Sequence, residues 1–143
     1  MRLKGEPLPL EVQQLLAPFF HGLDLSRVRI HEGIPRYVSI AAAAEAIGYT
    51  DGWHIYFAPE CYRIDSPEGL ALIAHEIAHC RQYHEMGKWQ FRAKYLAAYF
   101  QNRRNGMDAK TAYAQIPFEI EARQIERKVL AMLRRFQSDF IIE

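Results

Sequence analysis

One helical segment constrains the fold of this 143-residue chain more than any other feature. Residues 66–68 read Ser-Pro-Glu, which predicts a helix start, because Ser is a common N-cap residue and Pro is favoured at the first helical position. Residues 70–80 follow with LALIAHEIAHC, which is apolar except for His75, Glu76 and His79. A helix that is apolar around most of its circumference is buried, so these polar residues are expected in the interior.

The two histidines have the spacing of a metal site. Residues four positions apart share one face of an α-helix, so the imidazoles of His75 and His79 can reach the same ion. Glu76 can take a proton from a water in an open coordination position. Nitrogen and oxygen ligands around an open position suit Zn²⁺, which is therefore the expected cofactor. The alternative is a surface helix on which the histidine pair is coincidental.

A catalytic zinc site usually has three protein ligands, so a third ligand is expected downstream. Glu119 is preferred because it follows Pro117 at the start of a new helix, a rigid place from which to direct a carboxylate. The alternative is that Glu119 only favours the helix N-terminus and pairs with Arg123 four residues on. The other carboxylates that could supply the third ligand are Glu85, Asp108, Glu121, Glu126 and Asp139.

The whole pattern predicts an α+β fold, in which a small sheet from the first half packs on a helical second half. The strongest strand signal is a hairpin in which Asp51-Gly52 separates Tyr49-Thr50 from residues 53–57. Weaker strand signals cover residues 28–30 and 37–40. Helices are expected over residues 9–20, over 40–47 with Ser39 as cap and Gly48 as stop, over 66–86 and 88–105, after Asp108, and over 117–140.

Composition excludes several classes of protein. With 18 basic and 17 acidic side chains, the chain lacks the positive field of a nucleic-acid binder. Its apolar runs fall short of the roughly 20 residues that a membrane span needs, so no membrane partner is expected. MRLKGEPLPL at the start does not read as a signal peptide, and two cysteines are few for a disulfide scaffold, which favours a cytoplasmic protein with reduced thiols. The length predicts a single domain over residues 1–143.

The HEIAH helix followed by a distant glutamate resembles the gluzincin branch of zinc metallopeptidases. A longer stretch, VRIHEG and then GWHIYFAPECYRIDSPEGLALIAHEIAHCRQY, is similar to a metallopeptidase domain of bacterial proteins associated with extracellular contractile injection systems. This similarity covers residues 28–83. The PFEIEA segment resembles the third-ligand helix of several zincin families, whose ligand falls on Glu119. The resemblance implies a zincin-like fold, with a small twisted sheet packed on the half that carries the metal-binding helix.

One position departs from the resemblance. Many gluzincins have an Asp four residues after the ligand Glu, where it orients a ligand histidine, and this chain has Arg123 there. Glu121 or Asp65 would then have to orient the histidines.

The resemblance also implies that an extended peptide pairs with a strand above the metal helix. Residues 53–58 are the candidate strand, although the alternation of a plain core strand explains the same residues. The substrate-binding residues would be Trp53, His54, Ile55 and Tyr56.

Together these features predict a zinc metallopeptidase. His75, His79 and Glu119 would bind Zn²⁺, and Glu76 would act as general base in the attack of water on a peptide carbonyl of a polypeptide substrate. Tyr113 or Tyr37 could donate to the tetrahedral intermediate, and the sequence does not choose between them. The alternative is a catalytically silent module that keeps the zincin scaffold and docks to a partner protein or assembly. A hydrolase acting on a non-peptide amide is a third reading.

Overall fold

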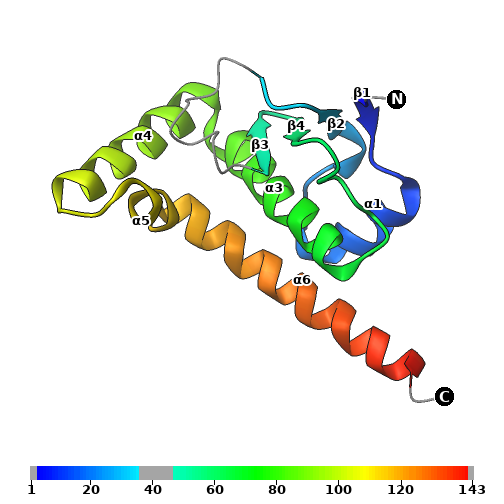
Figure 1. The fold of residues 1–143 in the computed structure, drawn as a ribbon. Helices are drawn as coiled ribbons and strands as arrows, with labels where there is room; N and C mark the ends of the chain where they lie inside the picture. The colour runs from blue at the N-terminus through cyan, green and yellow to red at the C-terminus, as the bar shows by residue number, and fades with distance from the viewer. Residues whose placement is uncertain (1–2, 36–46, 142–143) are drawn as a thin grey trace.

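The structure is a computed structural model that describes residues 3–35 and 47–141, with side chains described up to residue 137. The described part is an α+β protein with a small mixed sheet and five α-helices (Figure 1). No described helix is both long and apolar enough to cross a membrane. The elements in chain order are β1 (Lys4–Pro7), α1 (Leu10–Leu16), η1 (Ala17–Phe19), η2 (Leu25–Arg27), β2 (Arg29–Glu32), β3 (Gly48–Asp51), β4 (His54–Phe57), α3 (Pro67–Met86), α4 (Lys88–Arg104), α5 (Ala109–Ala114) and α6 (Pro117–Ile141).

Helix α3 is the centre of the fold and has the expected ends. The Ser66 hydroxyl accepts a hydrogen bond from the backbone N–H of Gly69 at 3.0 Å, which caps the first turn. At the other end Gly87 has φ of +90°, a conformation that stops the helix and that glycine adopts without strain. The predicted helix over residues 66–86 is therefore confirmed.

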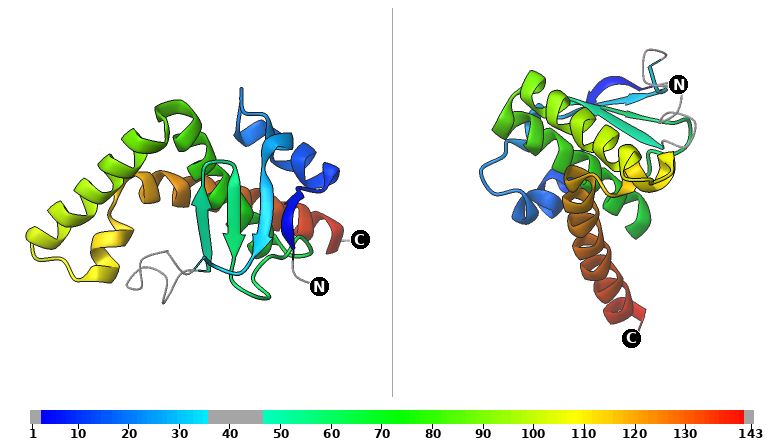
Figure 2. Two further views of the ribbon diagram at one scale, coloured as in Figure 1. Left: turned by 90° about the horizontal axis from the view of Figure 1, so that it is seen from above. Right: turned by 90° about the vertical axis from the view of Figure 1, so that its left-hand side faces the viewer.

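The four strands of the described sheet have the order β1-β2-β4-β3. β2 and β4 are parallel, whereas β1 pairs with β2 and β3 pairs with β4 in antiparallel fashion. The left view of Figure 2 shows β2, β4 and β3 side by side, with α3 behind them. The predicted hairpin is confirmed, and the turn residue Gly52 has φ of +64°.

The sheet order corrects one expectation about the substrate. Both edges of β4 are occupied, because β2 pairs with one edge and β3 with the other. A peptide therefore cannot pair with the main chain of residues 53–58, as the resemblance had implied. In the described part of the chain the strand at this end of the sheet is β3.

The core lies between the sheet and α3, and between α3 and the first half of α6. The inward face of the sheet contributes Ile30, Ile55 and Phe57, all fully buried. In Figure 1, α6 runs along α3, and its last turns project past the rest of the protein. The buried residues that join these two helices include Ile73, Ile77, Ala122 and Val129.

The predicted strand over 37–40 and the helix over 40–47 lie almost wholly in residues 36–46, which are outside the described residues. Gly48, expected to stop that helix, is instead the first residue of β3. Strand β1 was not predicted, because Gly5 and Pro7 are poor strand formers and its pairing with β2 is irregular.

Candidate metal centre

Helix α3 presents His75 and His79 on the face that packs against α6. The rings lie one turn apart with their centroids 5.1 Å from each other. Both residues are buried, with 9% and 6% of their surface exposed. Helix α3 therefore holds two imidazoles in the interior, as its apolar sequence predicts.

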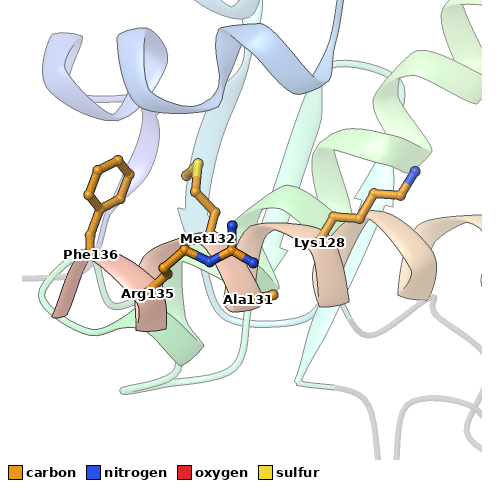
Figure 3. Close-up of a pocket in the computed structure, with 5 residues that line it drawn as sticks. All are labelled: Lys128, Ala131, Met132, Arg135 and Phe136. Atoms are coloured by element: carbon orange, nitrogen blue, oxygen red, sulfur yellow. The ribbon is translucent and has the colours of Figure 1, made fainter. Parts of the chain in front are cut away.

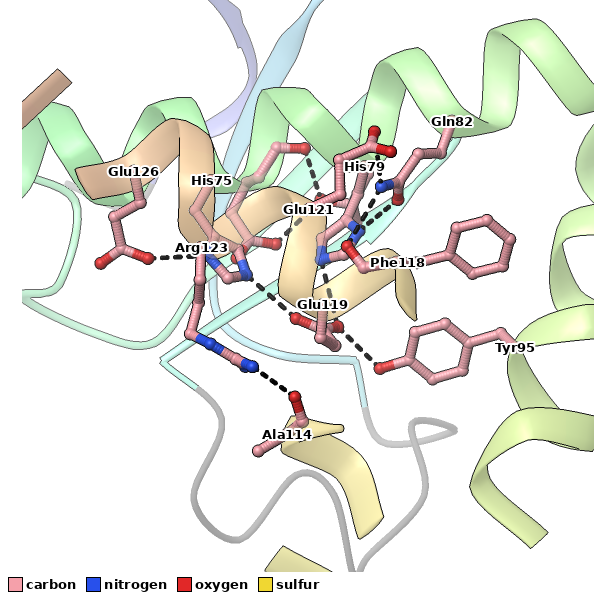
Figure 4. Close-up of polar contacts among 12 residues, drawn as sticks. His75, His79, Gln82, Tyr95, Ala114, Phe118, Glu119, Glu121, Arg123 and Glu126 are labelled. Carbon is pink, nitrogen blue, oxygen red and sulfur yellow. Dashed lines mark hydrogen bonds and ion pairs between the residues drawn. The ribbon is translucent and has the colours of Figure 1, made fainter. Parts of the chain in front are cut away.

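Glu119 of α6 completes the cluster (Figure 4). Its Oε1 lies 3.0 Å from His75 Nε2, and its Oε2 lies 3.1 Å from His79 Nε2. The three residues can offer one ligand atom each with all three atoms within 4.8 Å of one another, so they can hold a metal ion. Arg123 does not pair with Glu119, since its guanidinium donates to the Ala114 carbonyl.

The outer nitrogen of each histidine is also bonded. His75 Nδ1 donates to Glu126 Oε1 at 2.7 Å, and His79 Nδ1 donates to Gln82 Oε1 at 2.8 Å. These bonds leave both Nε2 atoms facing the cluster, which is the arrangement that orients ligand histidines in metal proteins.

Sequence reasoning expected Glu121 or Asp65 in these orienting positions. Glu121 contacts Gln82 rather than a histidine, because it accepts a hydrogen bond from Gln82 Nε2 at 3.2 Å. Gln82 is the residue that contacts His79. Gln82 could have been found from its position three residues after His79, and Glu126 from its position two turns after Glu119.

A tyrosine hydroxyl holds the carboxylate of Glu119 from the other side. Tyr95 of α4 donates to Glu119 Oε2 at 2.7 Å. The Tyr95 ring lies among aromatic side chains, 5.6 Å from Phe91 and parallel to Phe118 at 6.5 Å between centroids. Burial and the nearby charge of Glu119 raise the pKa of Tyr113 on α5. Tyr37, the other tyrosine considered from the sequence, lies outside the described residues.

Glu76 is held by strand β3, next to His75 on α3. Thr50 donates from its hydroxyl to Glu76 Oε1 at 2.9 Å. Gly48 lies so close that a Cβ there would be 3.0 Å from both Cδ and Oε2 of Glu76. Only 5% of Glu76 is exposed, so its carboxylate is fixed between a strand and a helix.

The protonation of each residue in the cluster depends on the charges of its neighbours. Burial alone would lower the pKa of His75, but hydrogen bonds to Glu119 and Glu126 outweigh burial and raise it from 6.5 to about 10. Burial would likewise raise the pKa of Glu119, but the nearby histidines hold it well below its usual range. In the metal-free protein the cluster is thus an ion pair of imidazolium and carboxylate.

Glu76 behaves differently from Glu119. Its burial raises the pKa above the ordinary value, against the opposing charges of His79 and His75. A carboxylate with a raised pKa holds a proton more readily than an ordinary carboxylate, which suits a group that accepts and returns a proton.

The residues expected to bind substrate do not meet the metal cluster. Ile55 is fully buried, and it is the register partner of Thr50, so it faces α3 as part of the core. His54 lies on the other face of the sheet and bonds through Nδ1 to His31 Nε2 at 2.9 Å. Tyr56 alternates with Ile55 and stacks on His31, with centroids 4.4 Å apart. Trp53 packs under the guanidinium of Arg27, which lies 4.5 Å from the ring centroid.

A hollow of about 360 Å³ on α6 is separate from the cluster (Figure 3). It begins more than two turns past Glu119, so it cannot hold a group that reacts at the histidines. Its lining residues are Lys128, Ala131, Met132, Arg135 and Phe136.

Both cysteines are free thiols in the structure. Burial raises the pKa of Cys80, which follows the ligand His79 in the sequence, so it stays a neutral core residue.

A family model matches much of the chain. The sequence model of the eCIS core domain matches residues 7–87, more than half of the chain. The match includes β3, β4 and α3, and it ends before Tyr95, Glu119 and Glu126. Comparisons with curated proteins and with solved structures find no match. The chain therefore belongs to the eCIS core domain family, which relates it to the extracellular contractile injection system and to a protein assembly.

Proposed function

We propose that this chain is a zinc-dependent metallopeptidase with a zincin-like fold. The observation that carries the proposal is the convergence of His75 Nε2, His79 Nε2 and the Glu119 carboxylate in the interior, with Glu76 beside them. Three protein ligands leave a coordination position open, as catalytic zinc sites do and structural sites do not.

The donor set fits Zn²⁺, because two imidazoles and one carboxylate are ligands that it prefers. When bound there, zinc supplies Lewis-acid chemistry, which polarises a carbonyl and makes water more acidic. Glu76 takes the proton from the attacking water and returns it to the leaving amine. Thr50 keeps the carboxylate of Glu76 in place, while Glu126 and Gln82 keep the two imidazoles in the tautomer that binds metal.

A variant pair tests the proposal. Glu76→Gln should keep about one zinc per chain and lose cleavage of an unfolded fluorescent casein, because only the proton carrier is removed. Glu85→Gln is the matched control, since its side chain is 65% exposed on the same helix and pairs with Arg81. Zinc content by mass spectrometry and casein cleavage are measured on the same samples. Equal cleavage by the wild type and Glu76→Gln would disprove the role of Glu76.

A second function is favoured by the burial of the site. Glu119 is 2% and Glu76 is 5% exposed, so a polypeptide reaches neither residue unless the surrounding side chains move. A silent module that uses the metal to hold α6 against α3 accounts for this burial. In that case the zinc-bound wild type cleaves no polypeptide, while removal of zinc lowers its stability.

A further inference from the structure

Helix α4 has two apolar stripes on opposite sides, and only one is packed against the protein. The packed stripe faces α3 and α6. There the ring centroid of Phe91 lies 4.3 Å from that of Tyr83 and 4.8 Å from that of Phe118. Phe91, which is 5% exposed, is the only buried residue among the 17 residues of α4. This long helix thus contributes little to the core and presents most of its circumference to solvent.

The second stripe, here called the outward stripe, has the periodicity of a packing surface. Its members follow the spacing i, i+4, i+7, i+8 and i+11, which is one face of a helix. The three large side chains are 76%, 54% and 57% exposed, in the order Trp89, Leu96 and Phe100. The small residues Ala93 and Ala97 lie between them and leave room for a side chain from outside.

The charges along α4 have one sign. The helix contains no Asp or Glu, and its five cations are Lys88, Arg92, Lys94, Arg103 and Arg104. Asp51 of β3 lies 2.9 Å from Arg92 and 3.7 Å from Lys88, so the charge at the start of the helix is partly balanced. Arg103 and Arg104, at the other end, are exposed. A partner that covers the outward stripe therefore meets a basic rim.

We infer that the outward stripe is a docking surface for an acidic amphipathic helix of a partner protein. From Trp89 to Phe100 the stripe is about 16 Å long, which matches three turns of a partner helix. Apolar side chains of that helix would fill the spaces over Ala93 and Ala97, and its flanking carboxylates would face the cations. A second copy of the chain that docks through its own α4 is disfavoured, since cations would oppose cations.

The test uses a photo-crosslinking residue in the intact chain, expressed in the cells that naturally produce it. Leu96→p-benzoylphenylalanine is compared with Leu10→p-benzoylphenylalanine, a control on α1 that is 65% exposed. We expect position 96 to crosslink to another protein, at a peptide in which apolar residues with helical spacing are flanked by Asp or Glu. The double change Arg103→Glu and Arg104→Glu should lower the crosslinking yield at position 96 about tenfold. A tenfold change in affinity corresponds to about 1.4 kcal/mol of binding free energy.

Several outcomes would overturn the inference. The first is a crosslinking yield at position 96 that is no greater than the yield at position 10. The second is a crosslink to a copy of this chain or to lipid, and the third is a partner peptide without acidic flanks. An unchanged crosslinking yield in the Arg103→Glu, Arg104→Glu variant would also overturn it. Circular dichroism and zinc content of each variant show that it is folded, and neither measurement depends on the partner.

Discussion

Each side chain that would bind the metal has a second contact that determines how it points. His75 donates a hydrogen bond to Glu126, and His79 donates one to Gln82. Glu119 accepts a hydrogen bond from Tyr95. Such outer contacts typically change metal affinity by about 10- to 100-fold when they are lost. The tyrosine is the clearest case, because its hydroxyl can be removed without changing the packing of its ring.

Tyr95→Phe should therefore weaken zinc binding about tenfold while the protein stays folded. The ring keeps its contacts with Phe91 and Phe118, but Glu119 Oε2 loses the hydrogen bond of 2.7 Å. Competition with a chelator of known affinity measures the change. Tyr99→Phe, one turn further along α4, is the control and should bind zinc as tightly as the wild type. Equal affinities in both variants would show that Tyr95 does not hold the ligand.

Sequence reasoning identified the cluster residues but not their supports. His75, Glu76 and His79 follow from one local spacing, and Glu119 follows from a helix start and a resemblance. Thr50 and Tyr95 left no comparable signal, because their contacts depend on how β3 and α4 pack against α3 and α6. Such contacts between distant segments are not encoded in local periodicity.

At the scale of elements, the close approach of β3 to α3 is what fixes Glu76. The approach depends on the absence of a side chain at position 48, since a Cβ there would be 3.0 Å from the Glu76 carboxyl. The strand and the helix were both predicted, yet the need for glycine was misread as a helix end.

Gly48→Ala should displace the Glu76 carboxylate and lower casein cleavage about tenfold or more, with zinc content unchanged. The reason is that the added methyl group lies 3.0 Å from the carboxyl carbon and Oε2 of Glu76, so this carboxylate has to shift, whereas no atom of His75 or His79 is among the nearest contacts of that methyl group. Ala58→Gly, a change in the loop after β4, is a control for general effects on the hairpin. A variant that cleaves like the wild type would show that Glu76 can move freely.

At the scale of the whole molecule, the metal-free cluster links stability to pH. The pKa of His75 is about 10 in the folded protein and 6.5 in the unfolded chain. Its protonation therefore stabilises the fold fully below about pH 6.5, and this contribution is lost as the pH rises toward 10. One pKa unit corresponds to about 1.4 kcal/mol. We therefore expect the free energy of unfolding of the metal-free protein to decrease by more than about 1 kcal/mol as the pH rises over this range.

Urea unfolding of the chelator-treated protein at pH 6.5, 8 and 9.5 measures this loss. The His75→Gln variant should show a smaller decrease over the same range, because it lacks the titrating group. The free energy of unfolding of the zinc-bound wild type should also decrease less between pH 6.5 and 9.5, since the metal would replace the proton on Nε2 of His75. A wild-type free energy of unfolding that does not change with pH would contradict the raised pKa.

Helix α6 supplies Glu119 and Glu126 to a site whose histidines lie on α3, and Glu119 follows His75 by 44 residues. Because a chain is made from its N-terminus, the ribosome releases both histidines long before the carboxylates that complete the site. A nascent chain therefore cannot complete this set of ligands until the start of α6 has emerged. Binding of a metal ion by all three residues has to wait for α6, so a product that terminates before Glu119 would lack both the third ligand and the helix that covers α3.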